Sequence, residues 1–257
     1  IGNLNDISER LKTTLSKVDI IAAEDTRITE TLCVHLNIKK PLISLRQFNE
    51  TKRVQDIKKR LLEGKNIALV TDAGTPVISD PGSTLIHALR QEHIEIIPIP
   101  GPSAITTLLS VAGLNSDKYF FGGFFPKKKS EALALFESYK FYDVPIVFFD
   151  SPKRLLKSLM WLNEHVQISY CCVGKELTKL YETIISGSLC NVIDKCNKIT
   201  LKGEFCFVLK LDNKTEEINE TLIMLLQSYK LSSKQITTVA KHLNYPKNKV
   251  YKLLIKD

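Results

Sequence analysis

Short apolar runs and longer amphipathic segments alternate along almost all of the first 211 residues of this chain. Runs of four to eight apolar residues between turn residues predict buried strands, and apolar positions repeating every three or four residues predict helices. Because strand and helix alternate, the pattern predicts an α/β fold with mostly parallel strand pairing.

The predicted strands cover residues 18–23, 42–45, 67–71, 94–99, 119–125, 144–149, 168–173, 182–186 and 204–211. The predicted helices cover residues 9–17, 30–36, 49–63, 83–92, 103–111, 130–139, 154–164, 189–196, 222–229, 234–243 and 247–255. Ser8 and Ser103 are the expected N-caps of their helices. Gly64 is expected just past the end of the helix over 49–63.

The alternation pauses at a polar linker over residues 113–117 and then restarts. We therefore predict an α/β domain over residues 1–114, a second α/β domain over 115–214, and a basic helical tail over 215–257. In the tail, two short helices flank the turn Asn244-Tyr245-Pro246 among several lysines, which resembles a helix-turn-helix module. An ordinary helical hairpin with solvated lysines is the alternative.

Charge and cysteine content narrow the class of protein. The net charge of +8 and the pI near 9.1 favour a polyanionic partner, with nucleic acid first and an anionic membrane surface second. A lysine-rich composition without functional meaning is the alternative. The six cysteines lack metal-ligand or disulfide-framework spacing, so we expect core thiols in a reducing cytoplasm and no metal site. No apolar run approaches the length of a membrane span.

Two loops rich in glycine and proline carry the chemistry. LVTDAGTPVISDPG (residues 69–82) and IPIPGPSA (97–104) each follow an apolar run, and open α/β sheets bind ligands at the carboxyl ends of their strands. Because GxGxxG, Walker A and HExxH motifs are absent, dinucleotide, P-loop and zincin chemistry lack support. The turn Asp72-Ala73-Gly74 suits a polar, zwitterionic or adenosine-bearing ligand, since it offers backbone groups and one carboxylate.

Seven segments in order resemble one known family: IGNLNDIS, AAEDTR, LVTDAGTPVISDPG, PIPGPSA, GFFPKKK, SPKRL and KELTKLYE. The family is ribosomal RNA small subunit methyltransferase I, in the tetrapyrrole-methylase-like, class III group of S-adenosylmethionine enzymes. The resemblance covers essentially the whole chain. It implies two α/β domains with the cofactor in the cleft between them, a homodimer, and methylation of a cytidine 2′-hydroxyl in the decoding region of small-subunit rRNA.

The resemblance also implies site residues. Those expected to bind S-adenosylmethionine are Gly2, Asn3, Asp72, Ala73, Gly74, Pro76, Pro100, Gly101, Ser103, Ala104, Glu176, Leu177 and Thr178. Those expected to contact RNA are Arg27, Lys127, Lys128, Lys129, Lys153, Arg154 and Lys179, with solvated surface charge as the alternative. Glu24 or Asp25 is expected to remove the ribose proton or to orient the base; the alternative is a helix-capping acid paired with Arg27.

The chain departs from the family pattern at several points. It begins at Ile1 as if partway through a motif, without the apolar strand that precedes IGNL. The family's LHxHNE, SPHRL and Arg before ELTK read LRQFNE, SPKRL and Lys175 here, which leaves no histidine for a role at those places. Two rival functions therefore stand beside the first: another class III methylase with a non-RNA substrate, and a catalytically silent RNA-binding or ribosome-assembly protein.

Overall fold

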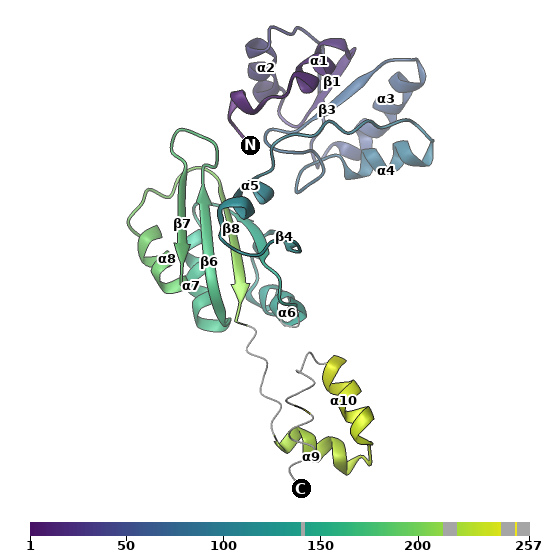
Figure 1. Cartoon of the computed structure of the whole chain (residues 1–257). Helices are drawn as coiled ribbons and strands as arrows, with labels where there is room; N and C mark the ends of the chain where they lie inside the picture. The colour runs from purple at the N-terminus through teal and green to yellow at the C-terminus, as the bar shows by residue number, and fades with distance from the viewer. Residues whose placement is uncertain (140–141, 213–219, 243–249, 251–257) are drawn as a thin grey trace.

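A computed structural model describes residues 1–139, 142–212, 220–242 and 250 (Figure 1). It confirms the predicted α/β class, with two sheets that are each covered by helices. The helices α9 (Glu220–Ser228) and α10 (Ser233–His242) lie apart from both sheets. Apart from Val250, the predicted helix over 247–255 lies outside the described residues, and so does the turn before it.

The first sheet contains three parallel strands in the order β2–β1–β3. Its strands are β1 (Ile20–Ala23), β2 (Leu42–Ser44) and β3 (Ile67–Val70), and its helices are α1 (Glu9–Lys17), α2 (Thr26–His35), α3 (Glu50–Leu62) and α4 (Ser83–Gln91). Adjacent β1 side chains point to opposite faces, so Ile21 packs with α1 and α2 while Ala22 packs with α3 and α4. Since β2 and β3 lie on opposite sides of β1, the strand order reverses between β1 and β3.

Helix ends in this domain follow the predicted local signals. The Ser8 hydroxyl accepts a hydrogen bond from Leu11 N (3.1 Å) at the start of α1. Helix α3 ends at Leu62, and Gly64 follows at φ +83°, a conformation that glycine adopts without strain. Ser103 occupies the N-cap position of α5 (Ala104–Val111), but its side chain makes no capping hydrogen bond.

The second sheet has five strands in the order β4–β5–β8–β6–β7. They are β4 (Phe120–Phe124), β5 (Ile146–Asp150), β6 (Ile168–Lys175), β7 (Thr183–Gly187) and β8 (Phe205–Leu211). Only β4 and β5 pair in parallel, so the prediction of mostly parallel pairing is wrong for this sheet. Parallel neighbours need a crossover of a dozen or more residues, and the short connection 176–182 between β6 and β7 permits only antiparallel pairing.

Helices cover both faces of the second sheet. On one face α6 (Lys129–Tyr139), α7 (Leu155–His165) and α8 (Leu189–Cys196) bury an aromatic cluster around Phe148 and Phe207. On the other face α5 packs through Leu108 against Val147, Cys172 and Val208. Helix α5 belongs to the predicted first domain yet packs on the second sheet; the boundary at residue 114 stays a prediction.

The predicted strand over residues 94–99 does not form. Ile94 N instead donates to Leu89 O (3.1 Å) just past α4, and the segment has no strand assignment. Ile94 and Ile96 are half-buried against the cluster between the first sheet and α3 and α4. The alternation of apolar residues is therefore satisfied by packing on side chains and not by a ladder of backbone hydrogen bonds.

Two further sequence expectations concern the burial of the cysteines and helices that could cross a membrane. Cys33, Cys171, Cys172, Cys196 and Cys206 are buried free thiols, as predicted, whereas Cys190 is exposed. Among the helices of the described residues, none is both long and apolar enough to cross a bilayer.

Candidate active site

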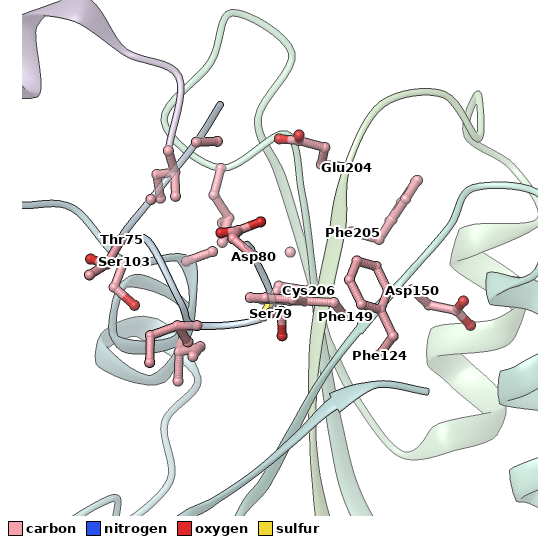
Figure 2. A pocket seen from close by; sticks show the side chains of 18 of the residues that line it. Thr75, Ser79, Asp80, Ser103, Phe124, Phe149, Asp150, Glu204, Phe205 and Cys206 are labelled. Carbon is pink, nitrogen blue, oxygen red and sulfur yellow. The ribbon is translucent and has the colours of Figure 1, made fainter. Parts of the chain in front are cut away.

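A cavity of about 670 Å³ opens between the carboxyl ends of the strands of the first sheet and the edge of the second sheet where β4 and β5 end and β8 begins. The loop after β3 and the start of α5 form one side, and the ends of β4, β5 and β8 form the other. Figure 2 shows the Asp80 side chain between Thr75 and Ser103 on one side and Phe205 and Cys206 on the other. Because the strand order of the first sheet reverses between β1 and β3, this is the crevice where an open α/β sheet binds its ligand.

Hydrogen bonds tie the loops after β1 and β3 together. The Thr71 hydroxyl donates to Glu24 Oε2 (2.6 Å), and Asp72 N donates to the same oxygen (3.3 Å). In return, Asp25 N donates to Asp72 Oδ1 (3.0 Å). Each loop thus holds a carboxylate of the other in place, and the geometry of the site does not depend on one flexible loop.

Asp25 is held by two arginines. Its carboxylate accepts hydrogen bonds from Arg27 and from Arg46 Nη2 (3.2 Å), and Arg46 Nε donates to Glu24 O (3.1 Å). The hydrogen bonds from Arg27 hold the pKa of Asp25 well below its usual range. A carboxylate stabilised in this way is a poor proton acceptor, so the geometry favours an orienting role for Asp25.

Asp80 has the opposite environment. Burial, and then the charge of Glu24, raise the pKa of Asp80 to about 6, although the neighbouring Thr71 hydroxyl acts in the other direction. The pKa of Asp72 is also raised, first by burial and then by the neighbouring Glu24 and Asp25. Three carboxyl groups, those of Glu24, Asp72 and Asp80, therefore line one wall. Burial and mutual repulsion disfavour their ionised forms, and a cationic ligand would reduce this unfavourable free energy.

The backbone next to Asp80 is strained. Val77 lies at φ +78° and Ser79 at φ +67°, and a β-branched residue with positive φ is rare. On the facing loop, Glu176 (φ +49°) and Thr178 (φ +68°) are strained in the same sense. Strain of this kind costs on the order of 1–3 kcal/mol per residue and gathers at ligand sites, which supports the assignment of the cavity as functional.

The facing loop, residues 176–182, is fixed by an ion-pair cluster. Lys179 Nζ contacts Glu176 Oε1 (3.0 Å) and Glu204 Oε2 (2.8 Å), and Glu204 N donates to Glu176 Oε1 (2.8 Å). Partial burial opposes the charge on Glu176, yet these partners outweigh it and its pKa lies below the ordinary value. Asn3 Nδ2 donates to Thr178 O (3.0 Å), which joins the first residues of the chain to this loop.

The rest of the cavity is largely apolar. Its lining includes Ile105, Phe121, Phe124, Phe149 and Leu177. An apolar wall facing three carboxylates suits a ligand with a flat, weakly polar part and a positive charge.

Comparisons with known proteins agree with this chemistry. The family model for tetrapyrrole (corrin/porphyrin) methylases matches residues 1–192. A ribosomal RNA small subunit methyltransferase I of Thermotoga maritima is 42% identical over 209 residues, which cover 81% of this chain and 94% of that relative. The protein of the same name from Buchnera aphidicola is 36% identical over 265 residues, covering 100% of this chain and 94% of the relative.

The chain belongs to the ribosomal RNA small subunit methyltransferase I family of tetrapyrrole methylases. Solved structures support the fold of this tetrapyrrole methylase. A cobalt precorrin-4 methyltransferase aligns with a TM-score of 0.59 at 15% identity over 81% of this chain and 90% of its own. A diphthine synthase aligns with a TM-score of 0.62 at 14% identity over 88% and 90%. The predicted fold class is therefore confirmed.

The structure of the methylase brings about half of the predicted cofactor residues into the cavity lining. Asp72, Ala73, Gly74, Ser103, Ala104 and Leu177 line it, and so does Glu24. The described lining does not include Gly2, Asn3, Pro76, Pro100, Gly101, Glu176, Thr178 or Asp25, which lie in the flanking segments. The roles of both groups stay predictions.

The residues predicted to contact RNA differ in the contacts that they make within the protein. Arg154 pairs with Asp150 and donates to Phe125 O (3.1 Å), and Lys179 is held by its two glutamates. Lys128 contacts Glu131 (3.0 Å) on the surface, and Arg27 pairs with Asp25. The side chains of Lys127, Lys129 and Lys153 are exposed. The exposed lysines thus remain the better candidates for phosphate contacts, while Arg154 and Lys179 support the protein itself.

We expect Arg154→Ala to lower the free energy of unfolding by about 2 kcal/mol, because it leaves the fully buried Asp150 carboxylate without its cation. Ser158 Oγ (2.6 Å) and Ser151 N (2.7 Å) would still donate to Asp150, which limits the loss. Urea titration of the variant measures it. Lys153→Ala is the matched control and should change stability by less than about 0.5 kcal/mol. Equal effects in both variants would contradict the structural role of Arg154.

Sequence reasoning missed Asp80 and Glu204, which both line the cavity. Asp80 stands inside the LVTDAGTPVISDPG segment, between Ser79 and Pro81. A carboxyl residue in a loop of this kind was the available signal. What could not be seen was its burial beside Glu24, which arises only when the ends of β1 and β3 meet.

Proposed function

We propose that this protein transfers a methyl group from S-adenosylmethionine to the 2′-hydroxyl of a cytidine in the decoding region of small-subunit rRNA. The observation that carries the proposal is the cavity itself, with three carboxylates on one wall and aromatic side chains on the other. The names of the relatives and the net charge of +8 support an rRNA substrate. We further propose that the protein is a cytoplasmic homodimer that acts without a metal.

The cavity fits S-adenosylmethionine in size and charge. Its volume of about 670 Å³ lies within the usual range for small-molecule pockets. Asp72 and its neighbouring carboxylates would face the positive charges of the cofactor, and Ile105, Phe149 and Leu177 would face the adenosine. When bound, the cofactor supplies a methyl group that is already activated for displacement.

The chain must then orient the ribose oxygen and accept its proton. Sequence reasoning points to Glu24 or Asp25, but Glu24 Oε2 already accepts two hydrogen bonds and Asp25 is held by arginines. We propose Asp80 as the proton acceptor, because a carboxyl with a pKa near 6 is ionised at neutral pH and still basic. Glu24 would position the loop that carries Asp80.

This role predicts a pH dependence. The logarithm of kcat/KM should rise between pH 5 and pH 6 and level off near pH 7, since only the ionised Asp80 accepts a proton. The raised pKa means that the folded protein binds this proton more tightly than the unfolded chain does. Asp80 therefore destabilises the fold at neutral pH and less so in acid. Acid unfolding caused by this group would therefore not explain the lower kcat/KM below pH 6. A flat profile with circular dichroism unchanged would contradict the role.

The decisive test of the activity is genetic and chemical. The gene is deleted, and ribose methylation is mapped along small-subunit rRNA by mass spectrometry of nuclease fragments. The proposal predicts the loss of one 2′-O-methylcytidine and its return when the purified protein acts on the undermethylated rRNA or on assembled subunits. An unchanged map would refute an rRNA ribose substrate.

Calorimetry with S-adenosylmethionine tests the rivals. A catalytically silent RNA-binding or ribosome-assembly protein would show no measurable binding. Another class III methylase would bind the cofactor but leave the rRNA map unchanged; the net charge of +8 favours a polyanionic substrate such as RNA. Light scattering of the purified protein tests the homodimer.

A further inference from the structure

A second cavity, of about 600 Å³, lies next to the first. Its lining comes from the first domain alone: the end of β1, the segment 46–50 after β2, and the residues around Asp80. Glu24, Asp72, Ser79 and Asp80 line both cavities. The proposed proton acceptor therefore stands in the wall shared by two spaces, one on each side.

The outer part of this second cavity carries a planar aromatic and a planar cation. Phe48 lines this cavity and is 82% exposed, so its ring is open to a ligand. Arg46 is 40% exposed, and its contacts to Glu24 O and Asp25 use two of the five N–H donors that a guanidinium carries. These contacts hold the guanidinium at the cavity while donors remain for a ligand.

We propose that the second cavity is the acceptor site, in which one unstacked nucleotide of a single-stranded RNA inserts with its base on Phe48. The inference rests on the proposed function and extends it to the residues that receive the substrate. Single-stranded RNA is recognised mainly by stacking splayed bases on aromatic rings and on guanidinium planes. Phe48 provides the ring, and Arg46 at the opening provides donors for a base edge or a phosphate.

The acidic residues of the second cavity fit this orientation. Asp25 is neutralised by Arg27 and Arg46, and the buried Glu50 accepts a hydrogen bond from Leu85 N (3.0 Å). The carboxylates of the shared wall accept hydrogen bonds from hydroxyl groups and repel phosphates. A nucleotide would therefore place its ribose at Asp72 and Asp80 and keep its phosphates at the opening, which brings the 2′-hydroxyl to the wall of the first cavity.

The test measures two affinities of the full-length protein. One is for a fluorescein-labelled single-stranded RNA from the decoding region, measured by anisotropy, and the other is for S-adenosylmethionine, measured by calorimetry. Phe48→Ala should weaken RNA binding about tenfold, the usual effect of losing one stacked base, and leave cofactor affinity within twofold. Phe48→Trp should bind RNA within about threefold of the wild type, because stacking is retained.

Val34→Ala is the matched control, since Val34 is an apolar side chain of α2 that is 74% exposed and lies outside the second cavity. It should change neither affinity. Wild-type RNA affinity in Phe48→Ala would overturn the inference, and so would an equal loss of cofactor affinity. If Phe48→Ala loses RNA affinity while the methylation map of the deletion strain is unchanged, the second cavity stands as an RNA-binding site, and both the proposed function and the acceptor role fail.

Discussion

Replacing Asp80 with asparagine is expected to lower kcat by about 10²–10⁴-fold, the usual contribution of a positioned general base. Asparagine has nearly the same size as aspartate, so the loop keeps its shape while the proton acceptor is lost. Affinity for S-adenosylmethionine should change by less than about tenfold, because Glu24 and Asp72 still line the wall. Single-turnover methylation of undermethylated rRNA, with saturating cofactor, separates this effect from binding.

Glu204→Gln is the matched control for Asp80→Asn. Glu204 lines the same cavity, but its carboxylate is paired with Lys179 at the mouth. We expect kcat of this variant to stay within about threefold of the wild type. A large loss in Glu24→Gln with little loss in Asp80→Asn would return the role of base to Glu24. The pH dependence of the Asp80→Asn variant should also flatten, which a purely structural role for Asp80 does not predict.

Asp72→Ala is expected to weaken binding of S-adenosylmethionine by about 30- to 100-fold, the cost of losing a charged hydrogen-bond partner. Asp72 contributes one of three negative charges to the wall, and its pKa is raised because burial, Glu24 and Asp25 all oppose its ionisation. A cationic ligand relieves that opposition, so part of the binding energy depends on this carboxylate. Calorimetry on the purified variant gives the dissociation constant.

Lys128→Ala is the comparison, because Lys128 lies on the surface, paired with Glu131. Its affinity for the cofactor should equal that of the wild type. Asp72→Asn separates charge from shape: asparagine can still accept from Asp25 N, so a loss close to that of Asp72→Ala would indicate that charge dominates. Equal cofactor affinities in Asp72→Ala and Lys128→Ala would contradict the assignment of the cavity.

The elements with strong local signals were predictable from the sequence. Buried strands such as β1 and β5 are short apolar runs between turn residues, and α8 was predicted to the residue. The sequence did not reveal which strands pair or in which direction. The direction of β6, β7 and β8 depends on the length of their connections and on which strands are neighbours. Apolar and other residues alternate over 94–99 as they would in a strand, but the segment packs on helices. Both are decided by contacts distant in sequence.

The candidate site divides in the same way. The loop after β3 could be expected to place Asp72 and Gly74 in the cavity lining, because open α/β sheets bind ligands at the carboxyl ends of their strands. Ser103 also lines the cavity, although the segment 94–99 before it forms no strand. Asp80 was missed, since its raised pKa follows from burial beside Glu24 and not from its neighbours in sequence. Phe48 was noted only as a departure from a histidine pattern, and its exposure in a concave surface is a property of the folded chain.

The positive φ angle of Val77 bears on how this protein responds to selection for thermal stability. Glycine at this position would release backbone strain at little cost to packing. We therefore expect a screen for a higher melting temperature to select Val77→Gly. The same change would free the loop that presents Asp80. Heat-resistant variants found this way are expected to have a higher melting temperature and a lower kcat. Both changes would come from one residue, three positions from the proposed base.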